Sequence, residues 1–217
     1  MNSFKSFFLN SEGDNWFRRN ISKINDEKYY DDFYSKEVLN LIKKLRGDIK
    51  LLDVGTSDGS RLKFISNRIR RKKIKLYGLD PSKVAVKSNK DKKIKIKVGT
   101  ADKIPFKKNY FDIVLFSFCL YLCDTKLLNK IVSETLRVLK KNSFIIFFEF
   151  YSKKKLYFNY KHISNSRIRI MNNSKIFISN SNVKLIKEKK ILYKLFYKIR
   201  RQKIENKMLA IHTLKKG

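Results

Sequence analysis

The chain has 217 residues, enough for a domain that buries a core without disulfides or metals. It carries 52 Lys and Arg against 19 Asp and Glu, a formal net charge of +33. This charge suggests a polyanionic partner such as nucleic acid or an anionic membrane face. The lysines are spread along the whole chain, however, and they far outnumber the arginines that bind phosphates in bidentate fashion. Nucleic-acid binding is therefore not the favoured main function.

The cysteine and histidine content gives no basis for a metal site. Cys119 and Cys123 lie in one apolar segment, and the two histidines are His162 and His212. These four residues lack the spacing of zinc ligands, and two buried thiols fit a reducing cytoplasm. The first residues, MNSFKSFFLN, form too short an apolar run for a secretory signal, and no stretch approaches the roughly 20 apolar residues of a membrane-spanning helix. The sequence predicts a soluble, cytoplasmic protein without a metal.

Strand-like and helix-like segments alternate from about residue 50 to 150, which is typical of a parallel sheet with crossover helices. Lys50–Val54 is the first expected strand, and a helix follows from Asp58 to about Arg71. Ile74–Leu79 is the second strand. Pro81 is well placed to open the next helix at its first position.

The second half of this region continues the alternation. Ile94, Ile96 and Val98 alternate with lysines, so we expect a third strand near an edge of the sheet. The apolar run Asp112–Phe118 predicts a central strand buried on both faces. Asp124 is the expected cap of the helix that follows, and Phe144–Phe150 is the fifth strand.

The remaining third of the chain is less regular. Residues 151–182 are polar and aromatic, and we interpret them as a long excursion or lid. Strands are expected at Val183–Ile186 and Met208–Leu214. The basic amphipathic segment Lys187–Lys203 favours a core helix with a solvated face, and a membrane-surface helix is the alternative.

The turn after the first strand, in LLDVGTSDGS (residues 51–60), holds two glycines at the edge of the sheet where α/β folds bind ligands. A dinucleotide loop needs glycines at 55, 57 and 60, but Ser57 and Ser60 occupy two of these positions. A phosphate-binding loop needs Gly-Lys-Ser/Thr at its end, but Ser60 and Arg61 follow Gly59. Both nucleotide interpretations are therefore excluded.

Four ordered motifs resemble the class I S-adenosylmethionine-dependent methyltransferases. Asp53, Gly55 and Gly59 match the first family motif, with Ser57 in place of its middle glycine. Tyr77–Asp80 resembles the acidic end of the family's second strand, and Gly99–Phe106 resembles its "GDAEELPF" segment. The fourth strand and the helix after it resemble "sFDvV" and "ReVLKPGG" at residues 109–114 and 135–140, with Asn142 and Ser143 replacing the final glycines. The resemblance covers about residues 48–150.

The resemblance implies a Rossmann-like α/β fold: a mostly parallel, seven-stranded sheet with an antiparallel last strand, helices on both faces and an N-terminal helical cap. It divides a single domain into a cap (1–47), a cofactor-binding core (48–150) and a lid with the C-terminal strands (151–217). The implied cofactor is S-adenosyl-L-methionine, released as S-adenosyl-L-homocysteine. Its expected binding residues are Asp53, Gly55, Thr56, Ser57, Gly59, Asp80, Pro81, Thr100, Ala101, Asp102 and Ser117.

Each expected contact has a chemical reason. Asp53 suits the ammonium group of the cofactor's methionine, and Asp80 suits the neutral ribose diol. Thr100 stands where the family often has an aspartate, so whether Asp102 takes over the adenine contact stays open. Ser117 ends the strand that lines the methyl group in the family.

The ends of the chain point to a subgroup. Residues 12–20, 118–124 and 160–162 resemble methyltransferases encoded with bacterial surface-sugar biosynthesis, including those associated with pseudaminic acid. The resemblance places Trp16, Arg19 and Phe118 at the cap or the substrate. His162 and Tyr121 are the candidate catalytic residues, because a hydroxyl acceptor loses a proton as it attacks.

The sequence therefore predicts an enzyme that transfers a methyl group to a sugar, a nucleotide sugar or another small molecule of surface-glycan synthesis. Two alternatives stay open. The first is a methyltransferase acting on RNA or another polyanion, which the net charge of +33 suggests. The second is an inactive, methyltransferase-like binding protein, which Ser57 and the missing glycines at 142 and 143 suggest.

Overall fold

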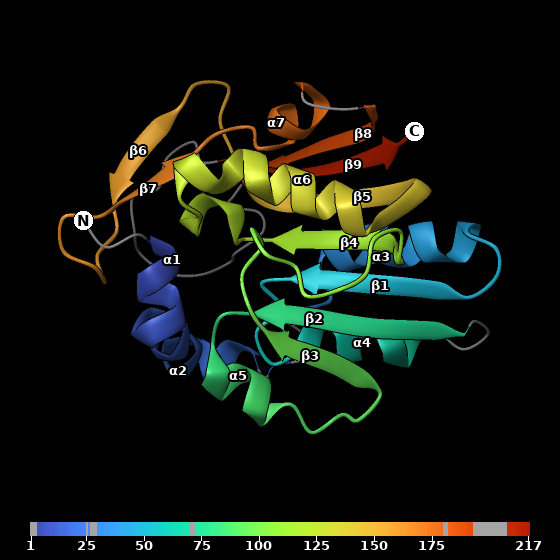
Figure 1. The fold of residues 1–217 in the computed structure, drawn as a ribbon, viewed down its shortest axis with the longest axis horizontal. Helices are drawn as coiled ribbons and strands as arrows, with labels where there is room; N and C mark the ends of the chain where they lie inside the picture. Colours follow the sequence, from blue (N-terminus) through green and yellow to red (C-terminus); the bar gives the residue numbers. More distant parts are fainter. Residues whose placement is uncertain (1–3, 25, 27–29, 70–72, 180–181, 193–207) are drawn as a thin grey trace.

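The main sheet has seven strands in the order β3-β2-β1-β4-β5-β9-β8 (Figure 1). The computed structural model describes residues 4–24, 26, 30–69, 73–179, 182–192 and 208–217. Strands β1 to β5 are parallel, β9 is antiparallel to β5, and β8 is antiparallel to β9. The predicted Rossmann-like sheet is therefore confirmed, with β3 at an edge. The bounds are β1 Ile49–Val54, β2 Ile74–Asp80, β3 Ile94–Val98, β4 Phe111–Ser117, β5 Leu139–Tyr151, β8 Val183–Leu192 and β9 Met208–Lys216.

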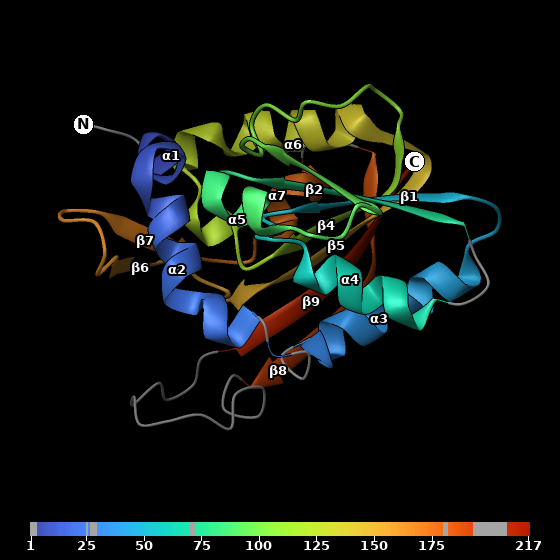
Figure 2. The same cartoon turned by 90° about the horizontal axis from the view of Figure 1, so that it is seen from below.

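Helices cover both faces of the sheet (Figure 2). Helices α3 (Phe33–Lys44) and α4 (Ser60–Arg68) pack on one face, where Tyr34 and Phe64 are almost completely buried. Helices α6 (Leu128–Val138) and α7 (Ser174–Ser179) pack on the other face. Strand β4 lies between these two apolar layers, which explains its continuous apolar sequence.

The N-terminal segment is helical and lies across the carboxyl ends of the strands (Figure 1). It comprises α1 (Phe4–Phe7), the π-helical turn η1 (Phe8–Glu12) and α2 (Gly13–Ile24). Phe17 of α2 packs with Ala85 of α5 (Lys83–Ser88), and the Asp14 carboxylate accepts hydrogen bonds from Ser82 Oγ at 2.6 Å and the Val84 N–H at 3.0 Å. The cap is thus joined to the second crossover of the sheet.

Two helix starts differ from the sequence prediction. Pro81 does not open α5, because Ser82 is the N-cap and its hydroxyl accepts from the Ala85 N–H. Asp124 does not cap the helix after β4 with its side chain, because the 3₁₀ turn η4 (Thr125–Leu127) intervenes before α6. The Asp124 carboxylate instead accepts from the backbone N–H groups of Phe4 and Lys5, which start α1 and lack intrahelical acceptors.

The segment after β5 contains a small antiparallel sheet of β6 (Leu156–Asn159) and β7 (Arg167–Ile170), followed by α7. The helix expected from Lys187 is wrong as far as Leu192, because these residues continue β8 and pair with β9. Its lysines are typical of an edge strand. The rest of that expected helix, residues 193–203, lies outside the described residues. Within the described part of the chain, no helix is long and apolar enough to cross a membrane.

Candidate active site

The turn between β1 and α4 has three left-handed residues at alternate positions. Gly55, Ser57 and Gly59 have φ angles of 78°, 57° and 83°. A Cβ atom on Gly55 would lie 2.7 Å from the Cβ of Cys119, so only glycine fits the approach of this turn to the end of β4. A Cβ atom on Gly59 would lie 2.9 Å from Cδ1 of Ile96, so this position is also crowded. Gly59 does not line the pocket. Ser57 adopts the left-handed conformation without glycine's freedom.

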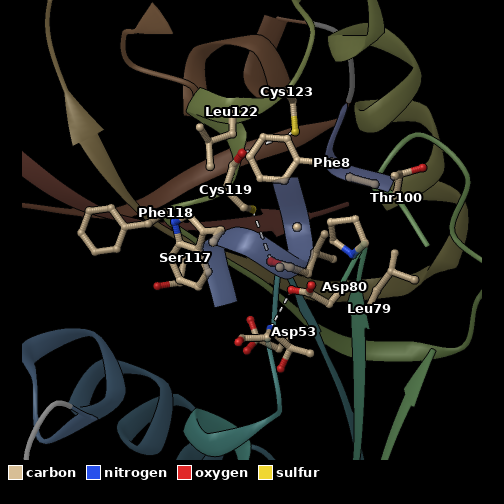
Figure 3. Close-up of a pocket in the computed structure, with 18 of the residues that line it drawn as sticks. Phe8, Asp53, Leu79, Asp80, Thr100, Ser117, Phe118, Cys119, Leu122 and Cys123 are labelled. Atoms are coloured by element: carbon tan, nitrogen blue, oxygen red, sulfur yellow. Dashed lines mark hydrogen bonds between the residues drawn. The ribbon is translucent and has the colours of Figure 1, made fainter. Parts of the chain in front are cut away.

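Asp80 at the end of β2 holds this turn in place. Its Oδ2 accepts a hydrogen bond from the Ser57 N–H at 2.7 Å, and its Oδ1 accepts from the Ser82 N–H at 2.9 Å. Burial raises the pKa of Asp80 to about 6, against the lowering effect of these two backbone bonds. The carboxylate faces the pocket (Figure 3) and keeps lone pairs for further donors.

Asp53 at the end of β1 is a buried carboxylate with a vacant acceptor. Its side chain is 2% exposed, and Oδ1 has no hydrogen-bond partner among the described residues. Burial raises its pKa to about 7, while the nearby Arg61 guanidinium acts in the opposite direction. An unpaired buried carboxylate oxygen in a pocket is costly without a donor. A cationic group of a ligand would satisfy it.

The loop after β3 forms another wall of the pocket, with Thr100, Ala101 and Asp102. Asp102 Oδ2 accepts from Lys5 Nζ of α1 at 2.7 Å. Burial raises the pKa of this carboxyl, but the hydrogen bonds from Lys5 and Thr100 outweigh that effect and hold it below the usual value. The loop and the N-terminal cap are therefore tied together at the pocket.

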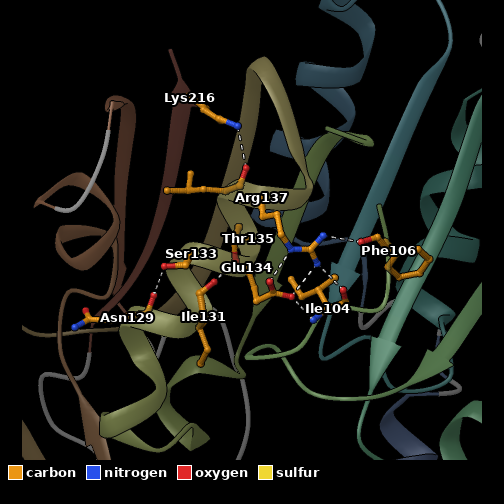
Figure 4. A network of polar contacts seen from close by, with 10 residues as sticks. Ile104, Phe106, Asn129, Ile131, Ser133, Glu134, Thr135, Arg137 and Lys216 are labelled. Atoms are coloured by element: carbon orange, nitrogen blue, oxygen red, sulfur yellow. Dashed lines mark hydrogen bonds and ion pairs between the residues drawn. The ribbon is translucent and has the colours of Figure 1, made fainter. Parts of the chain in front are cut away.

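Arg137 of α6 holds the far end of the same loop (Figure 4). Its guanidinium donates to the carbonyl oxygens of Ile104 and Phe106 at 2.8 and 2.9 Å and to Glu134, whose Oε2 accepts from the Ile104 N–H at 2.8 Å. Two of the sequence motifs, at residues 99–106 and 135–140, are therefore in direct contact. This contact is a physical reason for both motifs to occur in the same chain.

The segments converge on one pocket, which contains nearly all of the expected cofactor-binding residues. From the core, these are Asp53, Gly55, Thr56, Ser57, Asp80, Pro81, Thr100, Ala101, Asp102 and Ser117. Residues 52–147 match the family model described as a methyltransferase domain, and this range includes all of them. Residues 52–147 therefore form a class I, S-adenosylmethionine-dependent methyltransferase domain. S-adenosylmethionine is its cofactor, and Asp53 and Asp80 offer acceptors that fit the cofactor's ammonium group and ribose diol.

Solved structures of low sequence identity share this methyltransferase fold. A phosphoethanolamine N-methyltransferase 2 from Haemonchus contortus, in complex with phosphomonomethylethanolamine and S-adenosylhomocysteine, is 13% identical, with a TM-score of 0.70. The match covers 100% of this chain and 60% of that one. A Haloferax volcanii protein in complex with the methyltransferase activator Trm112 is 16% identical, with a TM-score of 0.67 and 94% and 96% coverage.

A third similar structure is that of a cyclase. The [4+2]-cyclase SpnF is 14% identical, with a TM-score of 0.61, and the match covers 83% of this chain and 80% of that one. Similarity at these identities shows the fold alone, and one fold carries many chemistries. No curated protein sequence matches the chain.

The end of β4 in the methyltransferase domain is shaped by Glu149, which sequence reasoning missed. Phe118 has a φ angle of 51°, and Glu149 Oε1 accepts from the N–H groups of Cys119 and Leu120, both at 2.9 Å. Burial raises the pKa of Glu149 to about 7. Ser117, Phe118 and Cys119 line the pocket, so Glu149 fixes the backbone of one wall. The signal in the sequence was a lone acidic residue inside an apolar strand.

Arg61 is a second residue that the sequence did not single out. It is 6% exposed, donates to Asp32 Oδ2 at 2.9 Å and to Ser35 Oγ at 2.7 Å, and lies over the ring of Tyr30. Both Arg61 and Tyr30 line the pocket. The buried ion pair between Arg61 and Asp32 joins the start of α3 to the start of α4, directly after the turn that follows β1.

The cap contributes apolar and polar side chains to the same pocket. Trp16 lines it, as do Phe4, Lys5 and Phe8 of the N-terminal segment. Arg19 does not line the pocket, because it forms an ion pair with Glu12. Tyr160 also donates to Glu12 Oε1, at 2.7 Å. Arg19 therefore lies where the cap meets the segment after β5.

The two candidate catalytic side chains also lie outside the pocket lining. Tyr121 packs edge-on against Phe150, with ring centroids 5.2 Å apart. His162 is exposed in the β6–β7 connection, and its ring lies 5.3 Å from that of Tyr160. The structure thus brings ten of the residues expected to bind the cofactor together in one pocket but does not bring Tyr121 and His162 to it.

Proposed function

We propose that the methyltransferase domain transfers a methyl group to a hydroxyl of a sugar, a nucleotide sugar or a related small molecule in surface-glycan biosynthesis. The observation that carries the proposal is that the cap side chains Trp16 and Asn20 share one pocket with Asp53 and Ser117. An aromatic ring and an amide suit a sugar ring, which presents an apolar face and hydroxyl groups. The resemblance of residues 12–20 and 118–124 to the surface-sugar subgroup, including the pseudaminic acid branch, supports the same acceptor class.

The proposed roles follow from the position of each group. Asp53 Oδ1 accepts from the ammonium group of the methionine part, and Asp80 accepts from the ribose hydroxyls. The backbone of the turn at residues 55–57 lies against the methionine part. Thr100, Ala101 and Asp102, with Pro81, surround the adenine. Ser117 and Phe118 line the region of the reacting methyl group.

Alignment is the main contribution that these residues make to the rate. S-adenosylmethionine supplies an activated methyl group for in-line displacement by the acceptor oxygen. Asp53, Asp80 and the wall built on Glu149 fix one partner, and Trp16 and Asn20 orient the other. Holding two reactants at near-attack distance supplies a large part of the acceleration in such transfers. Proton removal by His162 or Tyr121 makes the second, smaller contribution to the rate, because neither residue lines the pocket.

The reaction is proposed to occur in the cytoplasm, since Cys119 and Cys123 are both free thiols. We interpret residues 1–47 as the cap, 48–150 as the cofactor-binding core and 151–217 as the lid and C-terminal strands of one domain. In this division the acceptor enters between the cap and the core. The cofactor then lies below it, against the turn after β1.

A mass-spectrometric assay with S-adenosylmethionine and a panel of sugars and nucleotide sugars tests the proposal. We expect a product 14 Da heavier from at least one sugar, and loss of that product in Trp16→Ala. Cofactor binding is measured separately, by calorimetry with S-adenosylhomocysteine, and should persist in Trp16→Ala. Methylation of RNA with no sugar product, suppressed steeply by salt, would identify the polyanion alternative instead.

A further inference from the structure

Strand β6 exposes apolar side chains in succession. Leu156 is 42% exposed, Tyr157 is 56% exposed and Phe158 is 38% exposed. Single exposed apolar residues are normal on protein surfaces, but three consecutive ones on a projecting strand need an explanation. Among the described strands, β6 pairs with β7 alone (Figure 1). A two-stranded sheet has little core of its own to stabilise it.

The same segment is basic and contains no acidic residue. Lys153, Lys154 and Lys155 directly precede β6, Lys161 follows it, and all four are exposed. None of these lysines forms an ion pair with a described residue. Residues 152–171 include no Asp or Glu at all. The apolar side chains are therefore bordered by ammonium groups that no acidic residue of the segment neutralises.

The hairpin is fixed to the rest of the molecule through its β6–β7 connection and through β7. The Tyr160 hydroxyl donates to Glu12, and the Tyr160 ring lies 5.8 Å from that of Phe4 and 6.4 Å from that of Phe8. Arg169 of β7 is buried and donates to Asn173. The hairpin projects beyond the N-terminal helix in both views of the fold (Figure 2). Its outer strand is thus held in a defined position, with Phe4 and Phe8 of the pocket wall beside the β6–β7 connection.

We propose that β6 and the lysines beside it dock on an anionic lipid bilayer. The ammonium groups of Lys153, Lys154 and Lys155 pair with lipid phosphates. The edge of β6 that faces away from β7 lies in the interfacial layer, so Leu156 on one face of the strand and the ring of Tyr157 on the other both enter it. Amphipathic aromatic rings are favoured in this layer. The attraction grows with each lysine close to the surface and is lost within a Debye length. The proposal concerns this surface alone and does not depend on the acceptor of the methyl group.

Charge argues for a bilayer over two other occupants. A second copy of the chain also carries a net charge of +33 and would repel the hairpin. An RNA strand would suit the aromatic rings, but the three basic residues directly before β6 are lysines, and Arg167 of β7 is the one exposed arginine of the hairpin. The aliphatic Leu156 offers no stacking surface. Lysines next to exposed aliphatic and aromatic groups match an anionic membrane interface.

Vesicle co-sedimentation of the full chain tests the proposal, with vesicles of phosphatidylcholine alone or mixed with phosphatidylglycerol. The wild-type chain is expected to bind only the mixed vesicles. The triple variant K153A/K154A/K155A should bind them roughly 100-fold more weakly, at about fivefold per lysine. The matched control K92A/K93A/K95A removes three exposed lysines near the start of β3, at the other end of the sheet (Figure 1). Equal losses in the two triple variants would overturn the proposal, because they would show diffuse attraction only.

A second measurement reports the apolar contact. Tyr157→Trp should show a blue shift of the added tryptophan emission with mixed vesicles and none with phosphatidylcholine alone. Leu156→Ser should weaken vesicle binding about tenfold, as expected for an aliphatic side chain that leaves water. No blue shift, tighter binding of poly(U) through the same lysines, or self-association that Leu156→Ser abolishes would each contradict a membrane-docking hairpin.

Discussion

The backbone N–H of Ser57 donates to Oδ2 of Asp80 at 2.7 Å, which links the turn after β1 to the end of β2. Ser57 is the residue that replaces the middle glycine of the family motif, and its φ angle is 57°. The left-handed conformation that glycine adopts readily is thus held here by a hydrogen bond to a charged acceptor. The replacement keeps the shape of the turn.

Removal of the Asp80 carboxylate should weaken cofactor binding. In Asp80→Ala, the ribose hydroxyls lose their acceptor and the N–H groups of Ser57 and Ser82 lose their partner. We expect the affinity for S-adenosylhomocysteine to fall by about 2–3 kcal/mol, because charged hydrogen bonds contribute about 1.5–3 kcal/mol. Calorimetry measures the change. Asp91→Ala is the control, since that carboxylate also accepts from a backbone N–H but lies outside the pocket lining; equal affinity of both variants would remove Asp80 from the site.

Ser57→Gly should stabilise the fold. A non-glycine residue in the left-handed region costs about 1 kcal/mol, so glycine should raise the free energy of unfolding by up to that amount. Urea denaturation measures it. Asn109→Gly is a matched control at a φ angle of 52°, where the gain should be smaller because asparagine tolerates this conformation. A less stable Ser57→Gly variant would show that the serine side chain itself supports the turn.

The sequence predicted those parts of the fold that depend on local pattern. The apolar run of β4 and the glycines at residues 55 and 59 identified the central strand and the turn after β1, because each feature is contained in a few successive residues. The segment from Lys187 to Leu192 was expected to be helical but is a strand, because pairing of Lys190 with Ala210 and of its neighbours along β9 overrides the local amphipathic pattern.

The site residues that escaped prediction act across long stretches of chain. Asp124 binds the N–H of Phe4 over a separation of 120 residues, and Glu149 binds that of Cys119 over 30 residues. No local periodicity reports such contacts. A single acidic residue in an apolar run, as in FIIFFEFY at residues 144–151, is the kind of signal that can find them, because a buried carboxylate needs donors.

Cofactor affinity should depend on pH through Asp53. Burial raises its pKa to about 7, so much of the carboxyl is protonated in the ligand-free protein below that pH, and binding of an ammonium group must release this proton. Affinity for S-adenosylmethionine should fall by up to about tenfold for each pH unit below 7 and stay constant above it. Calorimetry in buffers of different ionisation enthalpy counts the protons released. Asp53→Asn should bind more weakly at pH 8 and lose this slope, and an unchanged slope would assign the proton to another group.

The stability of the N-terminal helix α1 should depend on Asp124, although 120 residues separate Phe4 from Asp124 in the sequence. Asp124→Ala leaves the N–H groups of Phe4 and Lys5 without their acceptors, and loss of such a cap costs about 1 kcal/mol. Because Phe4 and Lys5 line the pocket, S-adenosylhomocysteine must then order the helix as it binds, and its affinity should fall about fivefold. Asp124→Asn keeps one acceptor oxygen and should lose less. Unchanged affinity in the alanine variant would show that α1 does not contribute to cofactor binding.

Glu149 should make stability depend on pH in a direction that its burial determines. Its pKa rises from 4.5 to about 7 on folding, so the folded chain binds more protons than the unfolded chain between these values, and the free energy of unfolding falls as pH rises through that window. Glu149→Gln keeps an acceptor for the N–H groups of Cys119 and Leu120 but cannot ionise.

The stability of Glu149→Gln relative to wild type should therefore improve by up to about 3 kcal/mol between pH 5 and pH 8, as measured by urea denaturation. Glu149→Ala should instead be about 2–4 kcal/mol less stable near pH 5, because Cys119 and Leu120 lose their buried acceptor. A difference between the glutamine variant and wild type that stays constant with pH would mean that Glu149 is ionised throughout. In that case the charge of Arg169, which lowers the pKa of Glu149, stabilises the ionised carboxylate by more than burial destabilises it.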